Sequence, residues 1–450
     1  MLTDSLGNAV TLHDASSLVA INDFVEGLIA CEARAVNVLS LADTDHSAIA
    51  QAYCAALHMF AESREGPRNA RPFIDQAIKA VAHTPAGTPR EKRFVAAIAA
   101  LVNGDIARAI QLHEEQAREC PRDLVSLKLG QYHLFNAGDS PGMLRLALIA
   151  LPAAADVPYM HGMAAFAWEQ CHLLDQAEAA ARQAITMCRK EPWAHHALAH
   201  VLLTTGRIHE GQAFMRDVSP TWTGLNSFMV THNWWHQALF ALELDQHDEA
   251  LRLYDTQVWG VVKGYSQDQI GAVSLLARLE LAGVDVGERW QDVADHLVTR
   301  LDDHVLPFLD LQYVYGLARA GRPQAHTLMR HMETFAMGEA PGRAVWQSVA
   351  IPASQGLLAH ARGDHARAAQ ALGTALPRML EVGGSHAQRD LFEQIYLDAL
   401  MRTGQWVAAQ NIVQQRLRGQ PESARLQRQA QRIYPALGLD AALASLASLA

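Results

Sequence analysis

Paired histidines are the residues of this chain with the clearest chemical potential. His196 and His200 lie four residues apart in PWAHHALAH, and His232 and His236 repeat that spacing in THNWWHQAL. In an α-helix, residues with this spacing share one face, with Cβ atoms about 6 Å apart. Imidazole titrates near neutral pH and is a common ligand of Zn, Ni, Cu and Fe. Each pair therefore suits proton transfer or metal binding.

A repeated segment would place both pairs on neighbouring helices. The sequences NGDIARAI, AGDSPGML, LLDQAEAA and TGRIHEGQ are alike, and their anchor residues recur every 34 residues, at Ala109, Met143, Ala177 and Gly211. This period is typical of tetratricopeptide repeats, each of which is a pair of antiparallel helices. Further along the chain the interval lengthens, but the pattern of glycine or aspartate at the turn persists.

The expected fold is therefore all-α, a tetratricopeptide-like solenoid of helical hairpins curled around a concave cavity. The chain shows no strand-like alternation, so we expect no sheet. No linker divides the 450 residues, and we expect one continuous array in four stretches. These are an off-register helical region at 1–90, regular repeats with the histidines at 91–260, looser repeats at 261–420 and capping helices at 421–450.

The repeat register turns both histidine pairs toward one groove. Counted from Pro192, the first pair takes positions 5 and 9 of its helix, and counted from Thr231, the second takes positions 2 and 6. In tetratricopeptide repeats these positions face the concave side. Trp193 and Trp235 also take groove positions, and Glu169 in the preceding repeat supplies a carboxylate. We expect all three side chains to contribute to ligand binding.

A second candidate site is the stretch GGSHAQRD at residues 383–390. Ser385 and Gln388 form a capping box that begins a helix, so part of the pattern is structural. The unpaired N–H groups of a helix start, with Arg389 and His386 beside them, would favour an anion. Because a long array curves, we expect this loop to close over the histidine cavity, with Ser385, His386 and Arg389 binding the ligand.

Composition narrows the classes of partner. The chain has 47 acidic and 37 basic residues, and this balance argues against nucleic-acid binding and against a polybasic membrane anchor. The five cysteines form no CxxC pair and the start shows no signal peptide, so we expect reduced thiols and a cytoplasmic location. The phosphate-loop, dinucleotide-binding and HExxH motifs are absent.

Several stretches resemble the tetratricopeptide repeat protein 38 family. They are PWAHHALAHVLLTTGRIHEGQAFM, THNWWHQALFALELDQHDEALRLYD and GGSHAQRDLF, preceded by PRDLVSLKLGQYHLFNAGDSPGMLR. The resemblance extends over nearly the whole chain and is most specific from about 120 to 260. It implies an α-helical repeat fold, and it implies no biochemical role.

Two functions stay open at this point. The favoured one is binding of a small polar or anionic ligand, with or without a divalent metal, in a cavity lined by His and Trp. If the chain is an enzyme, it would be a hydrolase or lyase in which His196, His200, His232 and His236 act as acid and base, and the same four residues are the candidate metal ligands. The alternative is a non-enzymatic scaffold that holds a protein or peptide partner.

Overall fold

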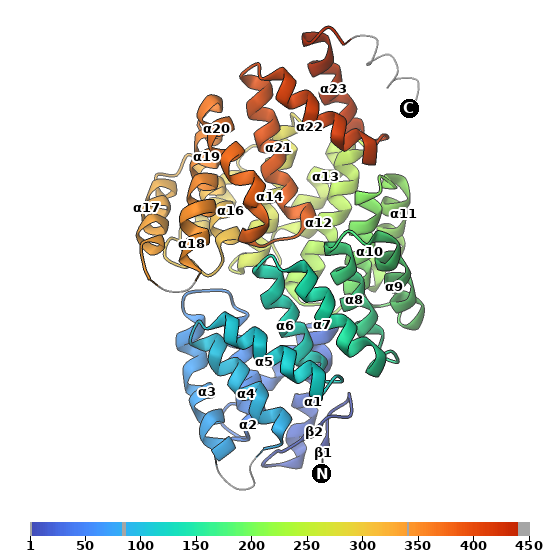
Figure 1. Ribbon diagram of the computed structural model, residues 1–450, viewed down its shortest axis with the longest axis vertical. Helices are drawn as coiled ribbons and strands as arrows, with labels where there is room; N and C mark the ends of the chain where they lie inside the picture. The colour runs from blue at the N-terminus through green and yellow to red at the C-terminus, as the bar shows by residue number, and fades with distance from the viewer. Residues whose placement is uncertain (1, 83–86, 340–341, 440–450) are drawn as a thin grey trace. The chain divides into compact units, whose positions relative to one another are not determined.

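The computed structural model describes residues 2–82, 87–339 and 342–439 (Figure 1). This part of the chain forms 23 α-helices, linked by short 3-10 and π-helical segments, and one two-stranded antiparallel ladder. The all-α prediction is confirmed. The expectation of no sheet misses the short ladder of Leu2–Thr3 with Ala9–Val10, whose turn is closed by the Asp4 carboxylate.

Two compact units make up the chain, and two helices contribute to both of them. The first unit contains 1–197 and 221–229, and the second contains 198–220 and 230–450. The sequence predicted one uninterrupted array with boundaries at 90, 260 and 420. The division between the two units falls inside α10 (Pro192–Thr204) and α12 (Ser227–Glu243), where no linker marks it. The boundaries at 90, 260 and 420 stay a prediction. Residues 440–450 of the predicted capping stretch lie outside the described residues.

Short helices follow one another along the chain in both units. The first unit contains β1 (Leu2–Thr3), β2 (Ala9–Val10), η1 (Ala15–Ser17), α1 (Leu18–Ile29), η2 (Ala33–Leu41), α2 (Ala48–Met59), α3 (Gly66–Ala82), α4 (Pro89–Val102), α5 (Ile106–Glu119), α6 (Leu124–Asn136), α7 (Ser140–Ala150), η3 (Leu151–Ala153), α8 (Pro158–Gln170) and α9 (Leu174–Met187). The second contains α11 (Ile208–Val218), α13 (His247–Leu253), η5 (Tyr254–Val258), α14 (Ser266–Leu281), α15 (Arg289–Leu297), α16 (Pro307–Arg319), α17 (Gln324–Ala336), α18 (Arg343–Val345), η6 (Trp346–Ala350), α19 (Ile351–Ala361), α20 (His365–Ala375), η7 (Leu376–Val382), α21 (His386–Arg402), α22 (Trp406–Gly419) and α23 (Ala424–Ala436). The segment η4 (Ser219–Thr221) precedes α12.

The 34-residue period is confirmed by the helix starts. Helices α5, α7, α9 and α11 begin at Ile106, Ser140, Leu174 and Ile208, each 34 residues after the last. The turns before α5, α7 and α11 place Gly104, Gly138 and Gly206 at φ of 77°, 73° and 73°. Glycine adopts this left-handed conformation at the lowest cost, which explains why it recurs at that position.

Close helix packing explains the small residues at the repeat anchors. Ala109 and Ala177 are fully buried. At Gly211 in α11, an added Cβ would overlap the ring of Phe240 in α12. Only a residue without a side chain lets these two helices approach so closely.

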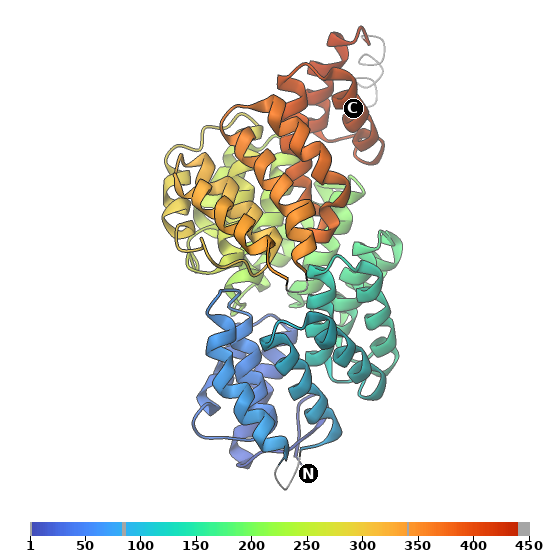
Figure 2. The same ribbon diagram turned by 60° about the vertical axis from the view of Figure 1, so that its left-hand side comes forward.

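Late repeats of the second unit pack against its first helices. Helix α14 packs against α21, more than a hundred residues later in the chain (Figures 1 and 2). In α12, the Glu243 carboxylate accepts hydrogen bonds from Arg425 Nε at 2.8 Å and from the Ser423 hydroxyl. The Gln420 amide donates to the Leu203 carbonyl at 2.7 Å. In the same unit, Gln388 in the first turn of α21 lines a cavity together with His232 of α12.

No helix among the described residues combines the length and the apolar character needed to cross a membrane.

Candidate functional site

The two histidine pairs lie on α10 and α12. Helix α12 begins at Ser227, so the sequence-based count from Thr231 starts one turn late. The physical reason is that α12 has 17 residues against 13 in α10, and the added turn precedes the histidines. The spacing within each pair is unaffected, because it depends only on the helical repeat.

The imidazoles of the two helices meet in a buried cluster. In the second unit, the ring centroid of His236 lies 4.6 Å from that of His200 and 4.9 Å from that of His232. His196 precedes His200 by one turn of α10. Each of the four residues offers a ring nitrogen, and the four nitrogens all lie within 4.8 Å of one another. All four side chains are buried.

Trp235 and Arg278 orient one imidazole of this cluster. The ring of Trp235 stacks on His232 and meets His236 edge-on, with centroids 5.1 and 4.9 Å apart. The Arg278 guanidinium of α14 lies 5.3 Å from the Trp235 ring centre. This guanidinium donates to the Ser274 hydroxyl and, at 2.6 Å, to the Ala387 carbonyl. The position of His232 is therefore linked to the packing of α14 and α21.

Burial decides which chemistry the cluster favours. Removal from water lowers the pKa of His232 to about 3, with a smaller contribution from neighbouring His200. The imidazole is therefore neutral at neutral pH. A group with this pKa is a poor general base near pH 7, whereas neutral imidazole is the form that binds metals. This pKa does not favour the acid–base role considered for His232, and that role remains an untested prediction.

In the first unit, the predicted residues Trp193 and His196 pack against each other. Trp193 contacts Phe166 and His196, with ring centroids 5.0 and 4.7 Å apart. The buried Glu169 carboxylate accepts a hydrogen bond from the Gln170 amide at 2.5 Å. Glu169 is not a member of the metal-ligand group of four imidazoles that the described residues form. His195 accepts a hydrogen bond from the Trp222 indole at 3.1 Å, as a packing residue does.

The 383–390 stretch forms the helix start that the capping box predicts. Ser385 Oγ accepts from the Gln388 N–H, and the Gln388 side chain accepts from the Ser385 N–H at 2.8 Å. Arg389 donates to the Gly383 and Gly384 carbonyls and lies near the His386 imidazole. The guanidinium therefore holds its own loop together.

A small cavity links this helix start to the histidine cluster. The side chains of His232, Trp235, Ser274 and Gln388 line the same space, which has a volume of about 10 Å³. A space of this volume holds about one water molecule.

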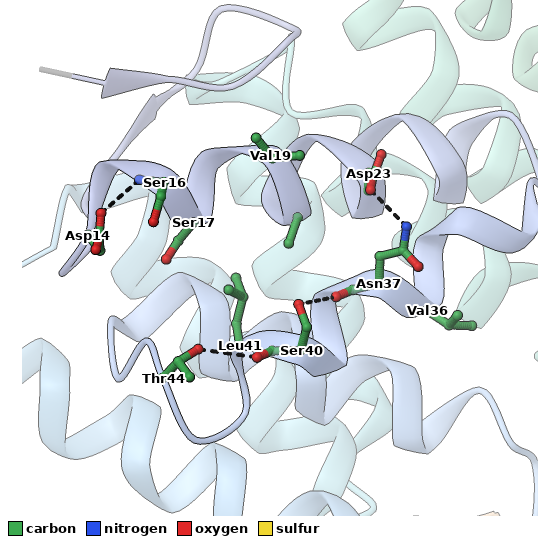
Figure 3. A pocket seen from close by; sticks show the side chains of 11 residues that line it. Asp14, Ser16, Ser17, Val19, Asp23, Val36, Asn37, Ser40, Leu41 and Thr44 are labelled. Carbon is green, nitrogen blue, oxygen red and sulfur yellow. Dashed lines mark hydrogen bonds between the residues drawn. The ribbon is translucent and has the colours of Figure 1, made fainter.

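A larger opening lies in the first unit, between α1 and η2, and sequence reasoning missed it. This α1–η2 groove has a volume of about 650 Å³ (Figure 3). Val19 and Val36 on its walls are 72% and 54% exposed. Both residues lie in the 1–90 region outside the regular repeats, so no register pointed to them. The sequence carried no signal for them, because Val19 lies between Leu18 and Ala20 and Val36 follows Ala35, as in an ordinary buried helix face.

The charged side chains of the groove are acidic. Asp14 and Asp23 line it, and the described lining residues include no Lys or Arg. The Asp14 carboxylate accepts the Ser16 N–H at 2.9 Å, and this hydrogen bond lowers its pKa. The Asp23 carboxylate accepts from the Asn37 amide at 2.8 Å and lies 3.8 Å from the Arg34 guanidinium. Both carboxylates are positioned by these bonds beside an apolar surface.

Comparison with known proteins finds no family model that matches the chain. Among solved structures, the human IFIT1 dimer with PPP-AAAA is similar, with a TM-score of 0.43 and 13% identity over 95% of each chain. The structure of Naa15/Naa10 bound to HypK-THB matches with a TM-score of 0.25 and 12% identity, over 96% of this chain and 68% of that one.

These structures correct one sequence-based prediction. Preferring a small-molecule ligand and excluding nucleic acid was wrong, because similar helical-repeat structures include one with an RNA, PPP-AAAA, and one with a protein. The physical reason is that net charge is summed over the whole chain, whereas a repeat protein recognises its partner through a local surface. The chain itself is an all-α protein built from tetratricopeptide-like helical hairpins.

Proposed function

We propose that this chain is a non-enzymatic helical-repeat scaffold that binds a protein partner through the α1–η2 groove. The observation that carries the proposal is the pairing of exposed Val19 and Val36 with Asp14 and Asp23 in one opening. Exposed apolar side chains that share one opening and are rimmed by polar residues are typical of interaction sites.

The chemistry of the groove specifies the partner segment. An apolar side chain of the partner would lie between Val19 and Val36, where its burial is favourable. Lys or Arg residues flanking it would meet Asp14 and Asp23. The proposed occupant is therefore a basic peptide segment with a central apolar residue. Acidic peptide segments would be repelled by the same carboxylates.

Synthetic peptides test this proposal directly. Peptides with a central Leu flanked by Lys and Arg are titrated into the full-length chain, and matched peptides with Glu flanks serve as controls. We expect the basic peptides alone to bind, with affinity that falls as salt rises. The paired variants Val19→Ser/Val36→Ser and Asp14→Asn/Asp23→Asn are each expected to weaken binding about tenfold, equivalent to about 1.4 kcal/mol.

Two features of the experiment separate a loss of binding from a change in folding. Asn at position 14 can still cap the helical segment, so Asp14→Asn changes charge with little change in local structure. Val407→Ser alters a valine that is 65% exposed on α22 and is expected to change nothing. A single-stranded RNA oligonucleotide forms a separate arm. Binding of the RNA without binding of the basic peptides would overturn the proposal, and so would equal binding of basic and acidic peptides.

Two finer assignments belong to this proposal. We place the chain in the tetratricopeptide repeat protein 38 family, on the stretches around the two histidine pairs and GGSHAQRDLF. We also place it in the cytoplasm, which its five free cysteines support.

A further inference from the structure

We propose that the imidazole cluster of α10 and α12 binds one divalent transition-metal ion. His200, His232 and His236 of the second unit supply three ligands, and His196, one turn before His200 on the same helix, supplies the fourth. This inference is independent of the α1–η2 groove and of any partner that the groove binds.

The ligand geometry carries the proposal. In a tetrahedral zinc site with Zn–N bonds of about 2.0–2.1 Å, neighbouring nitrogens lie about 3.3 Å apart. The four ring nitrogens here lie within 4.8 Å of one another, so side-chain rotations alone can close the remaining distance. Because each helix presents its two imidazoles one turn apart, a single ion can bridge α10 and α12.

The donor set selects the class of metal. Four imidazole nitrogens suit Zn²⁺, Co²⁺, Ni²⁺ or Cu²⁺, and they do not suit Ca²⁺ or Mg²⁺, which prefer oxygen. Four protein ligands close the coordination shell, which is the arrangement of a structural site. The ion would therefore hold α10 to α12 instead of activating water.

The surroundings resemble those of metal sites in which outer groups orient the ligands. His232 is held by the Trp235 ring, which is itself covered by the Arg278 guanidinium. The cavity of about 10 Å³ beside His232 gives space next to the cluster for an entering ion or a water.

A second group of possible metal ligands contains His360, His365 and Asp398. We interpret this group as a hydrogen-bond network and not as a metal site. His360 Nε2 contacts the Asp398 carboxylate at 3.0 Å, and His360 Nδ1 contacts the Tyr315 hydroxyl at 3.2 Å. Asp398 also accepts from Arg402 at 2.7 Å. Because both ring nitrogens of His360 are engaged and a cation neutralises Asp398, this group is a hydrogen-bond network.

Metal titration of the full-length chain tests the proposal. The protein is stripped with a chelator, dialysed and titrated with Zn²⁺ alone in a calorimeter. We expect one ion per chain and a raised Tm, and we expect Ca²⁺ to give neither. Titration with Co²⁺ adds a geometric readout, because four-coordinate Co²⁺ absorbs visible light much more strongly than six-coordinate Co²⁺. Failure of Zn²⁺, Co²⁺, Ni²⁺ and Cu²⁺ to bind would overturn the inference.

Variants identify the ligands. His200→Asn and His236→Asn keep a polar side chain of smaller volume and are expected to abolish stoichiometric binding, with folding checked by circular dichroism. His196→Asn is expected to weaken Zn²⁺ binding and to reduce the visible Co²⁺ bands as a water enters the shell. His209→Ala, at an exposed position on α11, and His365→Ala are matched controls and should bind one ion.

Each result decides a specific point. Binding of one ion by folded His200→Asn and His236→Asn would overturn the site. An unchanged affinity and Co²⁺ spectrum in His196→Asn would overturn the four-nitrogen shell. If a substitution prevents folding, the His232→Asn variant and the Co²⁺ spectrum of the unaltered chain still decide between imidazole ligation and no ligation.

Discussion

The indole of Trp235 stacks on the imidazole of His232, with ring centroids 5.1 Å apart and planes 11° from parallel. Both residues lie on α12, three positions apart, so the helix sets their spacing. Arg278 of α14 covers the indole at 5.3 Å. The orientation of a cluster imidazole is thus coupled to the packing of α12 against α14.

Replacing Trp235 should therefore affect metal binding without removing a ligand. We expect Trp235→Leu to lower Zn²⁺ affinity about 10- to 100-fold, the usual effect of losing a group that orients a metal ligand. Trp235→Phe retains a stacked ring and should have a smaller effect. Calorimetric titration measures both affinities. A folded Trp235→Leu protein with unchanged affinity would show that the stack has no orienting role.

The space around two glycines predicts opposite effects on stability when each is replaced by alanine. Gly211→Ala would drive a methyl group into Phe240, and we expect it to cost about 1–3 kcal/mol of unfolding free energy. Gly271→Ala, on α14, meets open space and should stabilise by up to about 1 kcal/mol. Urea unfolding measures both values. Combining Gly211→Ala with Phe240→Leu should restore part of the loss, and no restoration would exclude the ring contact as the cause.

Glu191 predicts a specific pH dependence of stability. Burial raises the pKa of this carboxyl to about 8, although the Ala194 N–H and nearby Lys128 oppose the shift. Between its usual pKa of 4.5 and about 8, the folded chain holds a proton that the unfolded chain releases. Stability should therefore fall by about 1.4 kcal/mol for each pH unit in this range.

The matched variant for this prediction is Glu191→Gln, which keeps an oxygen that can accept the Ala194 N–H. Urea unfolding at several pH values between 5 and 8 should show a shallower fall in stability for the variant than for the parent. Identical pH profiles would mean that Glu191 is ionised in the folded chain at neutral pH.

The bond between Glu243 and Arg425 holds α23 against α12. Both side chains are nearly buried, so Arg425→Ala leaves a buried carboxylate without its cation. We expect a loss of about 3–5 kcal/mol, with faster amide exchange in α22 and α23. Arg252→Ala removes an exposed ion pair with Glu249 and should change stability by less than about 1 kcal/mol. If amide exchange in α22 and α23 is unchanged in Arg425→Ala, the Glu243–Arg425 bond does not hold α23 against α12.

Helix starts and the spacing of the histidines could be predicted from the sequence, because they depend on residues that are close together in the chain. The 34-residue interval predicts the starts of α5, α7, α9 and α11, because each repeat needs the same turn and the same close helix packing. The i, i+4 spacing places His200 one turn from His196, and His236 one turn from His232, wherever those helices lie. The capping box predicts the start of α21 at His386, because Ser385 and Gln388 satisfy each other's N–H groups.

Contacts between segments that are distant in the sequence determine the cavity beside His232 and the α1–η2 groove. Gln388 shares a cavity with His232 because α14 packs against α21. These helices are far apart in the sequence, and neither local sequence predicts its contact with the other. The size of that cavity depends on how completely neighbouring side chains fill it. The α1–η2 groove likewise arises where two non-repeating segments meet and leave Val19 and Val36 uncovered. The sequence alone determined the helices and the faces that carry the histidines, because those depend on residues within one turn. Which faces meet and which stay open was decided by tertiary packing, because burial depends on the whole unit.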